Sequence, residues 1–421
     1  EEITALSLEV KFGSGGNEDP DISFPGSSIN YTENDPAVLI VAAATVNDPD
    51  SLDFSTGILR VDFSDGGTAD DRLAIRNEGN GAGQIGVVGS NVTYGGVTIG
   101  TFTGGIGTSP LVINFNSNAT SAVVQATLRN ITYENVSDDP STTPRNVRVV
   151  LSDGDGGTSN VENKAINVTA VNDAPVLATN TGMTVAEGST GTVITAAMLN
   201  EGDPDDIGSG LTYTVTTVPA YGTLYLSGTA LGNNDTFTQA DINAGLITYD
   251  HDGSQNLGDG FTFSLADGGE DSVASLTGQM FSITVTNVND AAVGLPTITG
   301  TAQEDETLTA DTSGISDADG LGAFSYQWLR DGVSIDGAAG ATYTLGDDDV
   351  GTRISVEVSY TDTYGATEGP LTSAQTSPVT NINDTPVANA DTATTNEDVT
   401  LNNIDVLGND TDVDGDALSV T

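Results

Sequence analysis

The sequence predicts an all-β protein built of β-sandwiches in tandem. Three observations predict it: short runs in which apolar and polar residues alternate, turn residues between those runs, and a motif that recurs along the chain. Residues 58–63, 211–215 and 353–358 alternate in this way, as half-buried antiparallel strands do. Gly, Asn, Asp and Pro interrupt the chain about every 8–12 residues, a spacing that is typical of a sandwich.

The composition limits the possible functions. The chain has 421 residues, with 10 Lys and Arg against 60 Asp and Glu, so its net charge is −50. This charge argues against binding to nucleic acid or to an anionic membrane surface. The absence of Cys excludes disulfides, thiolate zinc sites and cysteine nucleophiles. No apolar stretch approaches the roughly 20 residues of a membrane helix. The first residues do not resemble a signal peptide, so we expect a mature or excised segment.

A Val/Ile-Asn-Asp motif recurs at residues 171–173, 288–290 and 382–384 and predicts short linkers between units. Each copy follows a predicted strand, and Pro175 and Pro386 hold two of the copies extended. The copies are 117 and 94 residues apart, and either interval suits one sandwich. The predicted units are residues 1–173, with a Gly-rich insertion around residues 79–107, then residues 174–290, residues 291–384, and an incomplete unit at residues 385–421.

Two further patterns recur inside the units. The segments 121–133, 238–249 and 345–360 each predict a short helical turn that leads into a strand, with Thr238 as a helix N-cap. Acidic residues recur as a Glu followed 13–16 residues later by Asp-x-Asp, and as Asp in a turn late in each complete unit. The Glu and Asp-x-Asp sets are Glu33 with Asp48 and Asp50, Glu187 with Asp203 and Asp205, Glu304 with Asp317 and Asp319, and Glu397 with Asp412 and Asp414; the late turns carry Asp153 and Asp155, Asp267, and Asp362.

The recurring acids predict a calcium protein. Residues 174–290 contain no Lys or Arg, so ion pairing within that unit cannot neutralise its acids. Several carboxylates with a linker Asn and Asp supply the 6–8 hard oxygen ligands, at about 2.3–2.6 Å, that Ca²⁺ prefers. Mg²⁺ dehydrates too reluctantly for such an all-protein site, and zinc prefers His or Cys. The alternative interpretation is a solvated acidic surface with ordinary Asp-Gly turns.

These residues resemble a known family. The Glu, Asp-x-Asp and Asn-Asp linker set is similar to the calcium-binding signature of cadherin-like tandem repeats in large secreted bacterial adhesins of the RTX type. Residues 237–245 and 251–254 resemble chondroitin-sulfate-proteoglycan-type repeats. Residues 326–332 look like a bacterial Ig-like repeat, in which Trp328 lies between the sheets. The resemblance implies cadherin-like sandwiches at 1–173 and 174–290, an Ig-like sandwich at 291–384 and the start of a cadherin-like repeat at 385–421.

The resemblance also implies that the ions lie between units, although the linker is shorter than that of cadherins. The implied ligand sets are Glu33, Asn172 and Asp173 with Asp203, Asp205 and Asp267; Glu187, Asn289 and Asp290 with Asp317, Asp319 and Asp362; and Glu304, Asn383 and Asp384 with Asp412, Asp414 and Asp416. Asp48, Asp50, Asp153 and Asp155 would face a preceding unit.

Other motifs are weaker. Residues 410–416 resemble half of an EF-hand loop, but Thr421 occupies position twelve, where Glu is needed. Residues 81–86 match a dinucleotide-binding fingerprint without the helix that it requires. His251 is the sole histidine, and no spacing nominates a nucleophile for it. We therefore expect no enzyme.

The expected function is a structural stalk in an extracellular adhesin on a bacterial surface, with several Ca²⁺ ions stiffening the junctions for cell or biofilm adhesion. Its expected partners are the neighbouring repeats, without nucleic acid or membrane insertion. The alternative is a subunit of a filament or surface layer, in which the incomplete unit 385–421 is completed by strands of a neighbouring chain.

Overall fold

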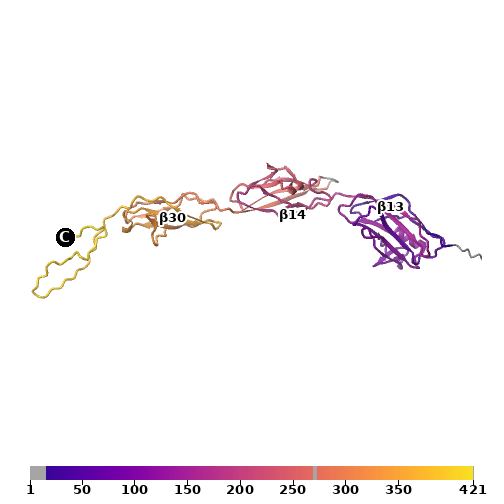
Figure 1. Ribbon diagram of the computed structural model, residues 1–421, viewed down its shortest axis with the longest axis horizontal. Helices are drawn as coiled ribbons and strands as arrows, with labels where there is room; N and C mark the ends of the chain where they lie inside the picture. The colour runs from indigo at the N-terminus through magenta and orange to yellow at the C-terminus, as the bar shows by residue number, and fades with distance from the viewer. Residues whose placement is uncertain (1–15, 269–272, 421) are drawn as a thin grey trace, which may run out of the picture.

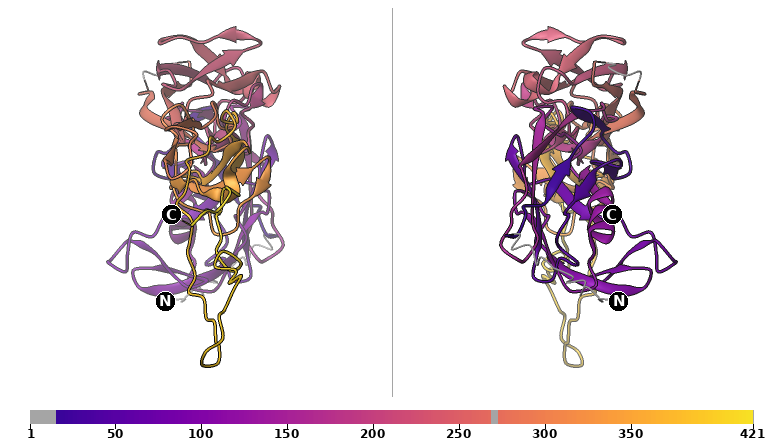
Figure 2. Two further views of the ribbon diagram at one scale, coloured as in Figure 1. Left: turned by 90° about the vertical axis from the view of Figure 1, so that its left-hand side faces the viewer. Right: turned by 90° about the vertical axis from the view of Figure 1, so that its right-hand side faces the viewer.

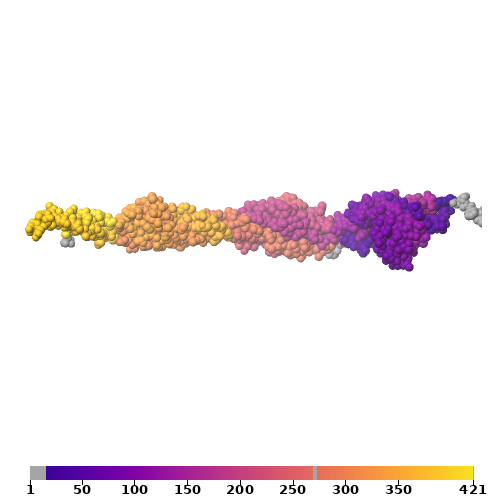
Figure 3. All heavy atoms as spheres, turned by 90° about the horizontal axis from the view of Figure 1, so that it is seen from below, coloured from indigo at the N-terminus to yellow at the C-terminus, as the bar shows by residue number. Residues whose placement is uncertain are grey.

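The computed structural model describes residues 16–268 and 273–420. Three sandwich units follow one another along a rod, and the C-terminal segment continues it (Figure 1 and Figure 3). Helical structure in these residues is limited to α1 (Ser121–Arg129), α2 (Gln239–Asn243) and the 3₁₀ turn η2 (Asp347–Asp349). The all-β prediction is confirmed. None of the described helices has the length and apolarity needed to cross a membrane.

The first unit is the largest. Its strands are β1 (Asp21–Ser23), β2 (Ser28–Thr32), β3 (Val38–Leu39), β4 (Thr45–Asn47), β5 (Ile58–Asp65), β6 (Asp71–Ile75), β7 (Ile85–Val88), β8 (Asn91–Tyr94), β9 (Val97–Thr103), β10 (Leu111–Phe115), β11 (Ile131–Asn135), β12 (Arg145–Ser152) and β13 (Glu162–Thr169). An eight-stranded sheet in the order β2-β13-β12-β5-β10-β9-β8-β7 packs on a smaller sheet, β3-β11-β6. The predicted Gly-rich insertion forms β7 to β9 and widens the large sheet. Figure 2, viewed along the rod, shows purple segments of this unit extending to one side.

The second unit is a sandwich of a five-stranded and a four-stranded sheet, ordered β15-β24-β23-β18-β21 and β16-β22-β19-β20. Its strands are β14 (Leu177–Asn180), β15 (Met183–Ala186), β16 (Thr192–Val193), β17 (Leu199–Glu201), β18 (Thr212–Thr217), β19 (Gly222–Leu226), β20 (Thr229–Ala230), β21 (Thr236–Thr238), β22 (Ile247–His251), β23 (Gly258–Ala266) and β24 (Leu276–Thr286). Thr238 caps α2 as predicted, because its hydroxyl accepts from the Asp241 amide while the Asp241 carboxylate accepts from the Thr238 amide.

The third unit pairs the sheet β25-β26-β29 with the sheet β28-β27-β30-β31. Its strands are β25 (Thr297–Thr299), β26 (Thr307–Asp311), β27 (Ser325–Arg330), β28 (Val333–Ser334), β29 (Thr342–Thr344), β30 (Ile354–Thr361) and β31 (Thr367–Thr372). Trp328 is fully buried between the sheets, and its indole N–H donates to the Gly340 carbonyl at 2.9 Å. This confirms the core position that the sequence predicted for Trp328.

The apolar residues of each sandwich pack into a separate core. Among the described residues, one buried cluster runs from Ile22 to Val168, a second from Met183 to Val285, and a third from Leu308 to Val379. Each cluster collects the inward side chains of alternating strands, as the period-2 pattern predicts. Because no cluster crosses a linker, the geometry between units depends on polar contacts at the junctions.

At each junction the segment that ends the unit pairs in parallel with a segment near its start. In the first unit β2 pairs with β13, and in the second β15 pairs with β24. In the third unit, Gln303 and Thr380 form an isolated parallel bridge. The sequence predicts a strand at 376–380, directly before the third linker, but only Val379 and Thr380 form bridges there. Pro378 has no amide to donate to a ladder, so the strand does not form over its predicted length. Residues 385–420 contain no strand, and only Val387 and Thr411 form a bridge.

Candidate metal sites at the unit junctions

Glu33, Glu187 and Glu304 each lie beside the linker that leaves their own unit. The parallel pairing makes the Glu amide donate to the carbonyl of the residue that ends the last strand or bridge. The distances are 2.9 Å for Glu33 to Thr169, 2.9 Å for Glu187 to Thr286 and 2.9 Å for Glu304 to Thr380. The same device thus places three side chains at the same point of three different units.

The Glu carboxylate then binds the linker backbone. One oxygen of each Glu accepts the amide that precedes the linker Asn: Val171 to Glu33 at 2.8 Å, Val288 to Glu187 at 3.4 Å and Ile382 to Glu304 at 3.0 Å. The second Glu oxygen is left to face the junction. The linker is therefore attached to the unit before it through one carboxylate oxygen.

The linker Asp contacts the unit that follows. Its amide donates to the second Asp of the Asp-x-Asp pair: Asp173 to Asp205 at 2.7 Å, Asp290 to Asp319 at 2.6 Å and Asp384 to Asp414 at 2.5 Å. The second Asp in turn donates its own amide to the first: Asp205 to Asp203 at 2.9 Å, Asp319 to Asp317 at 2.8 Å and Asp414 to Asp412 at 3.0 Å. Carboxylates from both neighbours therefore meet around each linker.

The linker Asn behaves differently at the three junctions. Asn172 donates to the late-turn residue Asp267 at 2.9 Å, which joins the two units. Asn289 donates instead to Glu368 at 2.9 Å, and Asn383 donates to the carbonyl of Asp384 at 2.9 Å. The first junction thus brings together its entire implied set, whereas Asn289 is not bonded to Asp362.

Several carboxylate oxygens at the junctions are buried without a hydrogen-bond partner, as expected of residues that bind a cation. In the described part of the chain, seven buried carboxylate oxygens accept no hydrogen bond, and all belong to residues that the sequence nominated as ligands. They are Glu33 Oε1, Asp48 Oδ2, Asp203 Oδ2, Glu304 Oε1, Asp319 Oδ1, Asp362 Oδ2 and Asp412 Oδ2. A buried charged oxygen without a partner costs several kcal/mol. Hard oxygen donors in this number fit a divalent cation such as Ca²⁺.

Carboxylates also gather closely at each junction. Three groups each place one oxygen per residue within 4.8 Å of the others: Glu33 with Asp138 and Asp173, Glu187 with Asp290 and Asp319, and Glu304 with Asp347 and Asp384. The sequence prediction missed Asp138 and Asp347. Both lie in the loop before the penultimate strand of their unit, within the acidic runs Asp138-Asp139 and Asp347-Asp348-Asp349. These runs were visible in the sequence, but their spacing does not recur.

Burial, together with repulsion among these acids, raises several pKa values. Burial, and then the neighbouring charges of Asp205, Asp173 and Asp138, raise the pKa of Glu33. Burial and the carboxylates of Asp173 and Asp203 raise the pKa of Asp205 in the same way. At the third junction the facing carboxyl group of Asp347 raises the pKa of Glu304. Such a site favours protons or a cation over free carboxylates.

Acidification is expected to stiffen the first junction when no metal is bound. The folded-state pKa values of Glu33 and Asp205 lie above their ordinary values of 4.5 and 3.8. Their stabilising contribution is therefore fully present below those ordinary values and is lost as the pH rises through the folded-state pKa values. Small-angle scattering of metal-free protein should show a stiffer chain at about pH 3.5 than at about pH 7.5. Equal profiles would contradict this, and Glu33→Gln should weaken the dependence.

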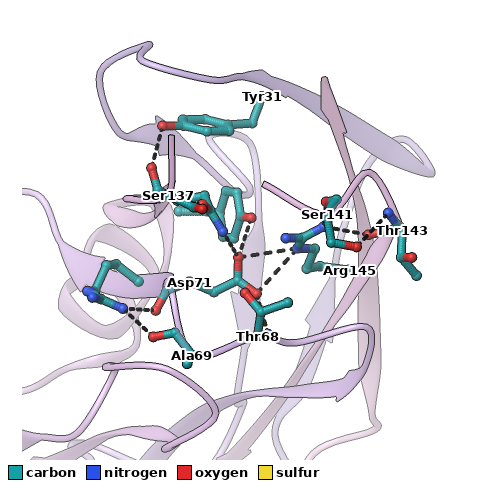
Figure 4. A network of polar contacts seen from close by, with 11 residues as sticks. Tyr31, Thr68, Ala69, Asp71, Ser137, Ser141, Thr143 and Arg145 are labelled. Carbon is teal, nitrogen blue, oxygen red and sulfur yellow. Dashed lines mark hydrogen bonds and ion pairs between the residues drawn. The ribbon is translucent and has the colours of Figure 1, made fainter. Parts of the chain in front are cut away.

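A buried ion pair holds the loop that carries Asp138. Asp71 and Arg145 are fully buried, and Arg145 Nε lies 3.2 Å from Asp71 Oδ1 (Figure 4). Tyr133 and Asn135 donate to the same Asp71 oxygen at 2.6 and 2.7 Å. Arg145 Nη1 donates to the carbonyls of two loop residues, Ser141 and Thr143. The network thereby fixes residues 136–144 against the end of the first unit.

The N-terminal end of the first unit repeats the linker pattern. The Asn17 side chain donates to Asp153 at 2.8 Å, and the Glu18 amide donates to Asp50 at 3.0 Å. These contacts match those of Asn172 with Asp267 and of Asp173 with Asp205. The sequence prediction missed this copy because Glu18 replaces the linker Asp, although Pro20 keeps the Asn-x-x-Pro spacing.

Asp153 is the most enclosed residue at that N-terminal end. Its carboxylate accepts the amides of Asp155, Gly156 and Gly157 within 2.8–3.2 Å. A Cβ at Gly157 would overlap this carboxylate, so the turn requires glycine there. The side chains of Asp155 and Asp416 are exposed, and only their backbone amides contact the predicted ligands Asp153 and Asp412. Part of the late turn of the second unit, residues 269–272, lies outside the described residues.

Comparison with known proteins supports the family resemblance. Residues 175–285 match the family described as Cadherin-like, and residues 383–421 match the one described as Bacterial Ig domain. The second unit is thus similar to cadherin-like domains, as the sequence predicted. The Ig match falls on the C-terminal segment, where the sequence predicts the start of a further cadherin-like repeat.

Several extracellular matrix proteins are similar to the chain. Mouse FRAS1, an extracellular matrix organizing protein, is 30% identical over 180 residues, or 37% of this chain and 4% of that protein. Human FRAS1-related extracellular matrix protein 1 is 36% identical over 94 residues, or 22% and 4%. Human chondroitin sulfate proteoglycan 4 is 38% identical over 104 residues, or 24% and 4%. The matched parts therefore span about 4% of the length of these relatives.

Solved tandem-domain structures resemble the chain only in fold. Domains EC1-4 of Drosophila N-cadherin are 13% identical with a TM-score of 0.26, over 85% of this chain and 75% of that one. Domains A168-A170 of titin are 12% identical with a TM-score of 0.28, over 86% and 99%. The observed sheets make the chain a tandem array of β-sandwiches, and the family matches show that residues 175–285 and 383–421 are similar to cadherin-like and bacterial Ig domains.

Proposed function

We propose that the chain is the structural stalk region of a large extracellular calcium-binding adhesin of the bacterial surface type, in which Ca²⁺ at the junctions holds successive units in line. One observation carries the proposal: buried carboxylate oxygens without hydrogen-bond partners recur at equivalent places at the unit ends. The bacterial Ig match supports a bacterial parent, and the matrix relatives support an extracellular location.

The residues that would hold the ions come from both neighbours and the linker. At the first junction they are Glu33, Asp138, Asn172, Asp173, Asp203, Asp205 and Asp267; at the second, Glu187, Asn289, Asp290, Asp317, Asp319 and Asp362; at the third, Glu304, Asp347, Asn383, Asp384, Asp412 and Asp414. Asp48, Asp50 and Asp153 would form the equivalent half at the N-terminal end. A bound cation would supply positive charge that replaces the repulsion between these carboxylates.

The expected affinity suits an extracellular stalk. Extracellular calcium modules bind at about 10⁻⁴–10⁻³ M, so millimolar Ca²⁺ would load the junctions and the cytosol would leave them flexible. At about 2 mM free Ca²⁺, which is about 2–20 times these dissociation constants, one site stabilises the bound form by about 0.6–1.8 kcal/mol. Flexibility before export and stiffness after it would help a long chain to pass through a secretion channel.

The proposal includes no catalytic step. His251 is buried, and its Nδ1 accepts the amides of Gly188 and Gly253 at 3.1 and 3.2 Å. This arrangement gives His251, the last residue of β22, a structural role in holding the turn that follows Glu187. The proposed partners are the neighbouring repeats and, in an assembled fibre, other copies of the chain.

Calcium removal is expected to make the rod flexible. Small-angle scattering in about 2 mM Ca²⁺ should give the distance distribution of an extended rod. Excess chelator should reduce the largest interatomic distance and broaden the distribution. Adding Ca²⁺ should restore the rod, whereas equal Mg²⁺ should not, because Mg²⁺ keeps its own waters. A profile that chelator leaves unchanged would refute the proposal. Sedimentation over a range of protein concentrations distinguishes the stalk from the filament. Only a filament subunit should form assemblies of increasing mass when Ca²⁺ is added.

A further inference from the structure

The loop before the penultimate strand contributes a side chain to every junction, but its chemistry differs. In the first and third units this loop places Asp138 and Asp347 beside the Glu and the linker Asp. The equivalent loop of the second unit lies between β22 and β23, and it places Gln255 there. An uncharged amide thus occupies, at the second junction, the position that a carboxylate holds at the other two.

Gln255 bonds both carboxylates that flank it. Its Nε2 donates to Glu187 Oε1 at 2.6 Å and to Asp290 Oδ2 at 2.9 Å. The Glu187 oxygen that it satisfies is the counterpart of Glu33 Oε1 and Glu304 Oε1, which are buried without a partner. Its own Oε1 is buried and accepts no hydrogen bond. The Gln255 amide therefore links Glu187 of the second unit to Asp290 of the linker, where a cation would otherwise link them.

A second neutral donor acts on the same junction. The Tyr360 hydroxyl donates to Asp317 Oδ2. The corresponding oxygens of the other Asp-x-Asp pairs, in Asp48, Asp203 and Asp412, are buried and unpartnered. Protein hydrogen bonds thus already satisfy Glu187, Asp290 and Asp317 at the second junction, where Asp319 Oδ1 and Asp362 Oδ2 are, among the described residues, the buried carboxylate oxygens left without a partner. Hydrogen bonds to charged groups are stronger than those between neutral groups, and an incoming cation would have to replace them.

We infer that Gln255 is a partial latch of the second junction when calcium is scarce, and that this junction loads with Ca²⁺ only at a higher concentration than the first junction. This inference rests on the proposed function. Calcium affinity in loop sites depends on the number of charged ligands and on site rigidity. A half-turn of the Gln255 amide would direct Oε1, in place of Nε2, at the ion. The array would then stiffen in two steps as calcium rises.

Spin-label distances across each junction test the inference on the full chain. Because the sequence contains no Cys, spin labels attach only to the two cysteines introduced in each variant. Ser64→Cys with Thr229→Cys spans the first junction, and Tyr221→Cys with Leu295→Cys spans the second. We expect the calcium midpoint for narrowing the distance distribution to be about tenfold higher at the second junction. Gln255→Glu, which adds the missing carboxylate, should lower that midpoint about tenfold. Gln279→Glu, which adds the same charge within β24, should not.

The latch is tested without metal. Gln255→Ala should broaden the metal-free distance distribution at the second junction and leave the first unchanged. Equal midpoints at the two junctions, or no effect of Gln255→Glu and Gln255→Ala, would overturn this inference while leaving the proposed function in place. If neither junction responds to Ca²⁺, the proposed function fails and the inference fails with it.

Discussion

Replacing Asp71 with Ala is expected to lower the free energy of unfolding of the first unit by about 3–5 kcal/mol. The substitution removes the carboxylate that faces Arg145, whose side chain is fully buried. The guanidinium then stays in the core without a counter-charge, and Tyr133 and Asn135 lose their acceptor. Hydrogen exchange of the β12 amides at increasing denaturant concentration would measure the loss in the free energy of unfolding.

An exposed ion pair of the same unit provides the matched control. Arg76 and Glu78 lie 2.7 Å apart, with 47% and 28% of their side chains exposed. Glu78→Ala should cost less than about 1 kcal/mol, because solvent screens such pairs. Similar losses for Asp71→Ala and Glu78→Ala would contradict the role of the buried network. Asp71→Ala should also weaken calcium binding at the first junction alone, since Arg145 fixes the loop that carries Asp138.

Replacing Glu33 with Gln is expected to raise the calcium midpoint of the first junction by tenfold or more, which corresponds to about 1.4 kcal/mol. The Gln carbonyl oxygen can still accept the Val171 amide, so the linker keeps its attachment. The group formed by Glu33, Asp138 and Asp173 loses one of its three charges. The Ser64 and Thr229 label pair would report the midpoint.

Glu162→Gln serves as the control for Glu33→Gln, because Glu162 begins β13 at the opposite end of the strand. It should leave the midpoint at the first junction unchanged. If Glu33→Gln and Glu162→Gln behave alike, Glu33 is not a ligand and the acids at the junction are merely solvated. A shift with Glu33→Gln that also appears at the second junction would indicate a general charge effect.

Local patterns explain why most of the architecture was predictable. Alternation along 58–63 and 353–358 reports a half-buried strand without any knowledge of its partner, and both segments lie in strands, β5 and β30. Thr238 and Asp241 satisfy backbone amides three residues apart, so the cap of α2 could be read directly. The Asp-x-Asp pairs were also predictable, because each pair binds its own backbone within two residues.

The sequence alone determined the repeating sandwiches, the linkers between them and the acids that recur at fixed distances from those linkers, since all of these are local patterns. Only the tertiary structure decided that Asp138, Asp347 and Gln255 reach the junctions. Their distances along the chain from the Glu residues differ between units. Parallel pairing of β2 with β13 and of β15 with β24 sets the Glu residues beside the linkers, and the packing of the sandwich brings the loops to the same place. Asp138, Gln255 and Asp347 lie 105, 68 and 43 positions after the Glu that each approaches, so these contacts depend on the packed sandwich and no local spacing encodes them.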